Sequence, residues 1–142
     1  MLPSDVVISQ EFAAHTPNRI VPVSEIPDDA MALDIGMETM DAMRAAMREC
    51  KSLVWNGPLG AFENTPFDMG TVALAREASI QTAKGELHSV AGGGDTVAAL
   101  AHSGLFDAFT YLSTAGGAFL EWMEGKELPG VAALARHAQA AA

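Results

Sequence analysis

The feature that most constrains the fold of this chain is the alternation of short apolar runs with stretches whose apolar residues recur at helical spacing. Strands are predicted at 5–9, 19–23, 31–35, 52–55, 87–91 and 109–113. Helices are predicted at 37–50, 70–84, 96–103 and 118–124. Strands that alternate with helices build right-handed βαβ units with helices on both faces of a parallel sheet. The sequence therefore predicts the α/β class, with three layers (αβα) and a mostly parallel sheet.

The composition indicates one soluble globular domain. The chain has 142 residues, of which 49% are hydrophobic and 18% are charged. No apolar run approaches the roughly 18 residues that span a bilayer, and the first residues have no secretory pattern. Cys50 is the only cysteine, which excludes an internal disulfide and is typical of a reducing compartment. We therefore expect a cytoplasmic location.

The charge of the chain restricts its partners. Eighteen acidic residues against eight Lys and Arg give a formal net charge of -10, which argues against nucleic-acid binding. None of the eight cations lies in a glycine-rich turn. A phosphate bound at such a turn would therefore meet backbone N–H groups rather than side-chain cations.

Three glycines, Gly92 to Gly94, stand between a predicted strand and a predicted helix, and Asp95 follows them. Glycines at this place let a ligand approach the backbone, and the N–H groups at the start of the helix attract phosphate. An acid there fits the chemistry if it holds a Mg²⁺ bridging phosphate oxygens. The alternative is a tight turn in which Asp95 is the N-cap of the helix. Neither the Walker A pattern nor GxGxxG is present.

Two further turns of small residues follow predicted strands. Asn56-Gly57-Pro58 leads towards Glu63, which is able to accept hydrogen bonds from a ribose, and Gly116-Gly117 precedes the last predicted helix. Each is equally consistent with an ordinary structured turn. In open α/β sheets ligands bind at the carboxyl ends of the strands. The two glycine turns would lie side by side there if their strands are neighbours.

Five motifs in order, "LVWNGPLGAFE", "PFDMGT", "GGGDT", "STAGGAFLE" and "EGKELPGVAAL", closely resemble the C-terminal part of phosphoglycerate kinase. The resemblance runs from "LPSDVVIS" to "LPGVAAL". It implies a Rossmann-like sheet, with residues 1–142 forming the second half of the nucleotide-binding lobe. It also implies a monomeric glycolytic enzyme that transfers a phosphoryl group between 1,3-bisphosphoglycerate and ADP, giving 3-phosphoglycerate and Mg-ATP.

The resemblance also implies roles for individual residues. Glu63 would bind the ribose and Asn56 the phosphates, while Ala32, Leu33 and Ala61 would line the adenine pocket. The nucleotide loop would comprise Gly93, Gly94, Asp95 and Thr96, with Asp95 the contact to Mg²⁺ held by ATP or ADP. The backbone of Gly116 and Gly117 would face the transferring phosphoryl group.

The chain departs from the family pattern in three places and in its length. Ala115 stands where a third glycine is usual, Phe119 where serine is usual, and Met37 where proline is common. The basic residues of the N-terminal lobe and of the first half of the nucleotide lobe are absent. The chain is therefore interpreted as a fragment of the kinase, inactive alone, with 3-phosphoglycerate bound by the missing lobe and with no membrane partner. The alternative is a stand-alone, non-catalytic nucleotide-binding or structural module.

Overall fold

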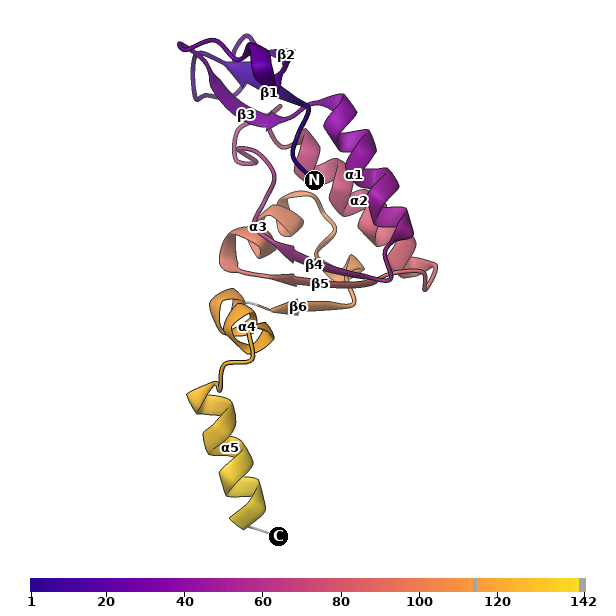
Figure 1. The fold of residues 1–142 in the computed structure, drawn as a ribbon, viewed down its shortest axis with the longest axis vertical. Helices are drawn as coiled ribbons and strands as arrows, with labels where there is room; N and C mark the ends of the chain where they lie inside the picture. The colour runs from indigo at the N-terminus through magenta and orange to yellow at the C-terminus, as the bar shows by residue number, and fades with distance from the viewer. Residues whose placement is uncertain (114, 141–142) are drawn as a thin grey trace.

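The computed structural model describes residues 1–113 and 115–140 and has the α/β class that the alternation predicts (Figure 1). Its strands are β1 (Asp5–Ser9), β2 (Arg19–Pro22), β3 (Met31–Ile35), β4 (Ser52–Asn56), β5 (His88–Gly92) and β6 (Tyr111–Ser113). Its α-helices are α1 (Met37–Glu49), α2 (Met69–Ala83), α3 (Gly94–His102), α4 (Gly116–Met123) and α5 (Pro129–Ala140). Short 3₁₀ turns lie at η1 (Val23–Glu25) and η2 (Phe106–Ala108). In the described residues no helix is long and apolar enough to cross a bilayer.

Strands β4, β5 and β6 form the predicted parallel sheet in that order. Helices α1, α2 and α3 share one hydrophobic core with the sheet. In this core Leu100 of α3 lies with Met40, Trp55 and Leu74. On the row Val54–Val90–Tyr111, which points away from that core, Val54 is 42% and Tyr111 58% exposed. The sheet is therefore covered by helices mainly on one face.

The first three strands form a separate antiparallel sheet in the order β2-β1-β3, which the alternation of elements did not indicate. The reason lies in the connections, because parallel neighbours need a crossover of a dozen or more residues. Residues 10–18, which join β1 to β2, are shorter than that and contain no α-helix, so these two strands pair antiparallel. Strand β3 pairs antiparallel with the other edge of β1.

A buried carboxylate from this small sheet caps each of the first two helices. Asp5 on β1 accepts hydrogen bonds from the N–H groups of Glu38 (3.1 Å) and Thr39 (2.8 Å) at the start of α1. Asp34 on β3 accepts one from the N–H of Gly70 (2.8 Å) at the start of α2. Since the first N–H groups of a helix have no partner within it, these carboxylates satisfy donors that would otherwise be lost.

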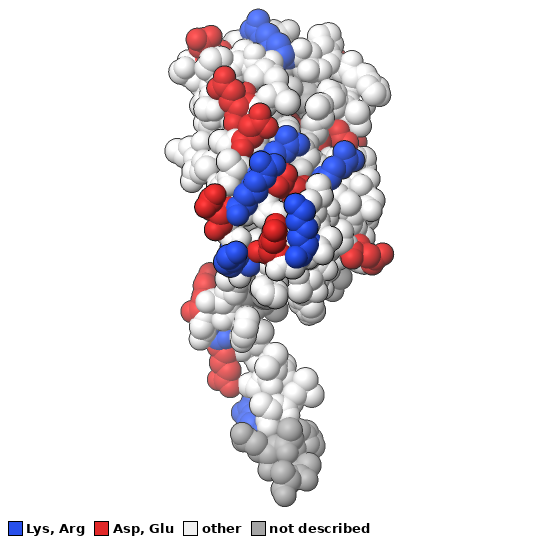
Figure 2. Space-filling model, turned by 90° about the vertical axis from the view of Figure 1, so that its right-hand side faces the viewer, with Lys and Arg blue, Asp and Glu red and all other residues white. Residues whose placement is uncertain are grey.

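The cations gather on the face formed by α1 and α2 (Figure 2). Five of the eight lie on these helices or within two residues of their ends: Arg44, Arg48, Lys51, Arg76 and Lys84. Arg48 donates to both carboxylate oxygens of Glu77, at 2.8 and 3.0 Å, and this pairing lowers the pKa of Glu77 to about 2. These cations therefore lie on the outer face of α1 and α2 and not in the glycine turns.

The last helix, α5, was not predicted from the sequence and extends away from the body of the molecule (Figure 1). Proline at its first position and the alanines that follow favour a helix, because proline is tolerated in the first turn and alanine has the highest helix propensity. The other boundaries differ from the predicted ones by up to two residues, as is usual at fraying ends.

Candidate functional site

The two glycine turns meet at the carboxyl edge of the parallel sheet, as the sequence predicted for neighbouring strands. Gly93 has a φ of +104°, and its N–H donates to the carbonyl of Ser113 at the end of β6 (3.1 Å). A Cβ placed on Gly116 would lie 2.5 Å from both the Cα and the N of Gly93. The starts of α3 and α4 are thus in direct backbone contact.

We expect Gly116→Ala to lower the free energy of unfolding by about 1–3 kcal/mol, because the new methyl group overlaps backbone that cannot move aside. Gly117→Ala is the control, since a Cβ at Gly117 meets nothing within 4 Å. Its stability should stay equal or rise slightly, because alanine favours helix. Urea denaturation of both variants measures the difference, and equal stabilities would contradict the close packing of Gly116.

Thr96 holds the segment after β4 against α3. Its hydroxyl oxygen accepts a hydrogen bond from the N–H of Gly57 at 2.7 Å, and the residue is only 1% exposed. The side chain of Asn56 is exposed, with its Oδ1 3.6 Å from the Cβ position of Gly93. The Thr96 hydroxyl therefore contributes to the packing of the segment after β4 on α3.

Asp95 is not the N-cap of α3, so the N-cap part of that alternative is wrong, while an ordinary tight turn stays open. The cap position belongs to Gly93, and no side chain caps this helix. Asp95 is exposed in the first turn, and its carboxylate has no hydrogen-bond or ion-pair partner within residues 1–113 and 115–140. A Cβ on the neighbouring Gly94 would likewise meet nothing within 4 Å. The carboxylate and the open space above Gly94 are available to a ligand.

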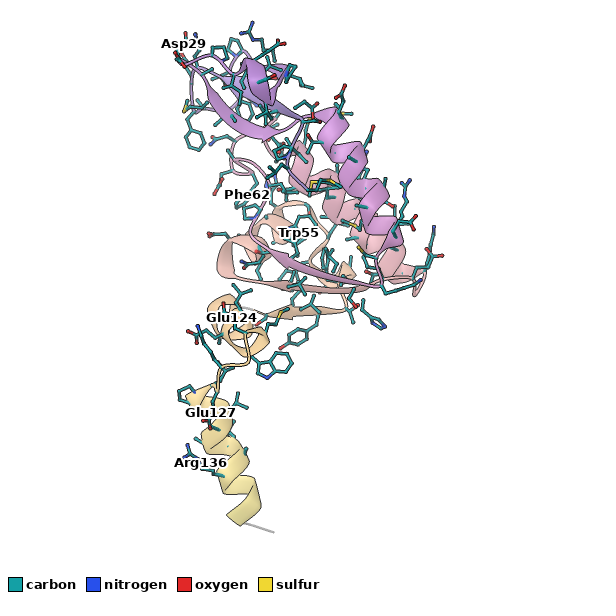
Figure 3. All side chains as sticks on the ribbon, in the orientation of Figure 1. Asp29, Trp55, Phe62, Glu124, Glu127 and Arg136 are labelled. Atoms are coloured by element: carbon teal, nitrogen blue, oxygen red, sulfur yellow. The ribbon has the colours of Figure 1, made fainter. Side chains whose placement is uncertain are left out.

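A second cluster lies on the segment between β4 and α2. The N–H of Ala61 donates to the carbonyl of Leu33 on β3 at 2.8 Å, which brings two of the predicted adenine-pocket residues together. Ala32 and Glu63 are exposed. Phe62, beside α3 in Figure 3, packs edge-on against His102 with ring centroids 6.2 Å apart. The segment that carries Glu63 therefore rests on the C-terminal end of α3, whereas the glycine turns lie at the start of this helix.

Asp34 is a residue of this region that the sequence analysis did not single out. It is 4% exposed, and burial raises its pKa to about 6. Hydrogen bonds from Gly70 and Ile35 act against that rise, and the charge of Asp68 adds to it. A carboxylate inside the apolar run Met31–Ile35 was the signal available in the sequence.

Side-chain cations are absent from the segments 56–68, 93–96 and 115–117. Thr114, next to the last of these, lies outside the described residues. Within the described parts of the chain, no three His, Cys, Asp or Glu side chains gather into a metal-binding group. A divalent cation here would need most of its oxygen ligands from a bound phosphate, as Mg²⁺ commonly does in phosphate-transferring sites.

Comparison with known proteins decides the family. The profile of the phosphoglycerate kinase family matches residues 1–126. The chain belongs to the phosphoglycerate kinase family. It is 59% identical over 134 residues to the phosphoglycerate kinase of Methylorubrum extorquens strain PA1, and 61% identical over 133 residues to that of Zymomonas mobilis. Each alignment covers 94% of this chain but 34% of the relative, so the chain spans about a third of the curated relatives' length.

Solved phosphoglycerate kinases have the same fold. The structure from Coxiella burnetii matches with a TM-score of 0.82 and 38% identity, over 89% of this chain and 32% of that one. The structure from Pyrococcus horikoshii matches with a TM-score of 0.74 and 28% identity, over 93% and 31%. These similarities confirm both the fold class and the family resemblance seen in the sequence motifs.

Proposed function

We propose that this chain is the C-terminal portion of the nucleotide-binding lobe of a phosphoglycerate kinase. The whole enzyme would act in the cytoplasm as a monomer and transfer a phosphoryl group reversibly between 1,3-bisphosphoglycerate with ADP and 3-phosphoglycerate with Mg-ATP. In this proposal residues 1–142 bind the nucleotide, and 3-phosphoglycerate is bound by the part of the enzyme outside this chain. Neither nucleic acid nor membrane is a partner.

The observation that supports this proposal best is the contact between the two glycine turns at the carboxyl ends of β5 and β6. Helices α3 and α4 both begin there, so unpaired N–H groups and the positive ends of two helix dipoles lie at one place. Such a place favours phosphate oxygens without any side-chain cation. In the proposed site, Gly93, Gly94 and Asn56 contact the nucleotide phosphates, and Gly116 and Gly117 contact the transferring group.

The exposed carboxylate of Asp95 fits a Mg²⁺ that arrives with the nucleotide, because hard cations prefer oxygen ligands and Asp95 has no partner in the described residues. When bound, Mg²⁺ would neutralise charge on the phosphate oxygens during transfer. By holding the metal, Asp95 would position the phosphates at the start of α3. Ala32, Leu33 and Ala61 would enclose the adenine, and Glu63 would accept hydrogen bonds from the ribose.

Calorimetric titration of this chain with ADP, with and without Mg²⁺, tests the proposal directly. We expect saturable binding that strengthens with Mg²⁺, because the site contains acids but no cations. Absence of binding at millimolar ADP would contradict a nucleotide-binding role for the isolated chain.

Gly94→Ala should leave the fold intact yet weaken Mg-ADP binding tenfold or more, about 1.4 kcal/mol. A Cβ at Gly94 meets no protein atom within 4 Å, so the methyl group would enter only the space assigned to phosphate. Gly130→Ala is a matched control, because Gly130 also lies in the first turn of a helix with nothing within 4 Å. Unchanged affinity in Gly94→Ala would make this glycine part of an ordinary turn.

A further inference from the structure

A buried carboxylate lies between the two ends of the segment that connects β4 to α2. A Cβ on Gly60 would lie 2.5 Å from Oδ1 of Asp34, and a Cβ on Gly70 would overlap the same oxygen. The Asp34 carboxylate thus occupies space that a side chain at position 60 or 70 would fill. Its Oδ2 accepts the N–H of Gly70 and its Oδ1 the N–H of Ile35, both at 2.8 Å.

Strand β3 holds this connecting segment at two adjacent positions. The Leu33 carbonyl accepts the N–H of Ala61, and the Asp34 carboxylate holds Gly70. Glu63 lies between the two points of attachment. The phosphate side of the proposed site is held differently, through Thr96 and Gly57 and through the β5–β6 pairing. The two halves of the site therefore depend on different contacts.

We propose that Asp34 is a positioning residue for the nucleoside, which fixes residues 57–69 so that Leu33, Ala61 and Glu63 stand together. This inference rests on the proposed function and assigns a role to a side chain that is too buried to touch a ligand. Both oxygens of a carboxylate accept hydrogen bonds. In Asp34→Asn the amide NH₂ would face a backbone N–H, so one of the two bonds is lost while the volume is kept.

Asp5 offers a matched control. It too is a buried strand carboxylate that accepts backbone N–H groups at the start of a helix, those of Glu38 and Thr39. In the described residues its carboxylate accepts hydrogen bonds from Glu38 and Thr39 of α1 and none from residues 57–69. Asp5→Asn should therefore lower the free energy of unfolding by weakening a buried helix cap, while the contacts of residues 57–69 stay intact.

The experiment compares both variants with the unaltered chain at pH 8, in three measurements. These are amide hydrogen exchange, affinity for Mg-ADP, and affinity for Mg-tripolyphosphate, which lacks the nucleoside. For Asp34→Asn we expect exchange in residues 57–69 to accelerate at least tenfold and Mg-ADP affinity to fall tenfold or more. Tripolyphosphate affinity should change less than threefold. Asp5→Asn should leave both affinities within threefold.

The outcomes separate this role from the proposed function. Unchanged exchange in residues 57–69 of Asp34→Asn, or an equal loss of Mg-ADP affinity in Asp5→Asn, would overturn the role of Asp34 alone. If the unaltered chain binds neither ADP nor tripolyphosphate, the proposed function fails, and with it the nucleoside role. If Asp34→Asn does not fold, Gly70→Ala is tested in its place. The new methyl group would push the Asp34 carboxylate aside without removing it, and we expect the same changes in exchange and in the two affinities.

Discussion

Purified alone and supplied with 3-phosphoglycerate and Mg-ATP, the 142-residue chain is expected to show no turnover. Phosphoryl transfer depends on positioning and on positive charge around the transferring oxygens. Residues 56–68, 93–96 and 115–117 contain no Lys or Arg, and five of the eight cations lie on or beside α1 and α2. Backbone N–H groups alone do not supply that charge.

An assay that couples product formation to a second enzyme measures this turnover. The full-length phosphoglycerate kinase of Zymomonas mobilis, which is 61% identical over the shared region, serves as the positive control under the same conditions. Activity of the chain above the background of a mock purification would contradict its interpretation as one part of the kinase. Nucleotide binding without turnover supports that interpretation but would also be seen for a stand-alone binding module.

Asp95→Ala, introduced in a full-length context, should lower the catalytic rate by at least about a hundredfold, as expected when oriented metal charge is lost. The free energy of unfolding should change by less than about 0.5 kcal/mol, because Asp95 is exposed and makes no cap. Steady-state kinetics and urea denaturation on the same preparation give both numbers.

Asp107→Ala, which removes another exposed acid from the 3₁₀ turn η2, is the control and should leave rate and stability near those of the unaltered enzyme. The metal role would be wrong if Asp95→Ala retained its rate, or if the stability fell by several kcal/mol while the activity per folded molecule persisted.

Short apolar runs were sufficient to predict the strands, and helical spacing was sufficient to predict α1, where Met40, Met43 and Met47 recur at three and four residues. Helices α2, α3 and α4 were predicted with the help of the glycines at their ends. These patterns were not sufficient to predict how β1, β2 and β3 pair, because strand direction depends on the connections rather than on the strands. The length of residues 10–18 was visible in the sequence and would have indicated the antiparallel pairing of β1 with β2. The Ala-rich segment that forms α5 was not predicted as a helix, although proline at its start and Val131 and Leu134 at helical spacing were visible in the sequence.

In the candidate site, the sequence predicted which turns meet but not which atoms are available. The burial of the Thr96 hydroxyl and the position of Asp95 inside the first turn of α3 depend on where that helix begins, which sequence patterns locate only to within a residue or two. Ala115 has a φ of −102°, so alanine is accommodated there in place of the usual glycine. Asp34 was missed because its partners, Gly60 and Gly70, are distant in sequence.

Helices α1 and α2 each begin on a carboxylate that belongs to the small antiparallel sheet. Loss of that sheet would leave two helix starts without acceptors and expose Asp5 and Asp34 together, so the sheet and the helices have little freedom to melt separately. We read the small sheet as the element that makes unfolding of residues 5–83 cooperative. Amides in β1, in β3 and in the first turns of α1 and α2 would then share one free energy of exchange, as members of one foldon.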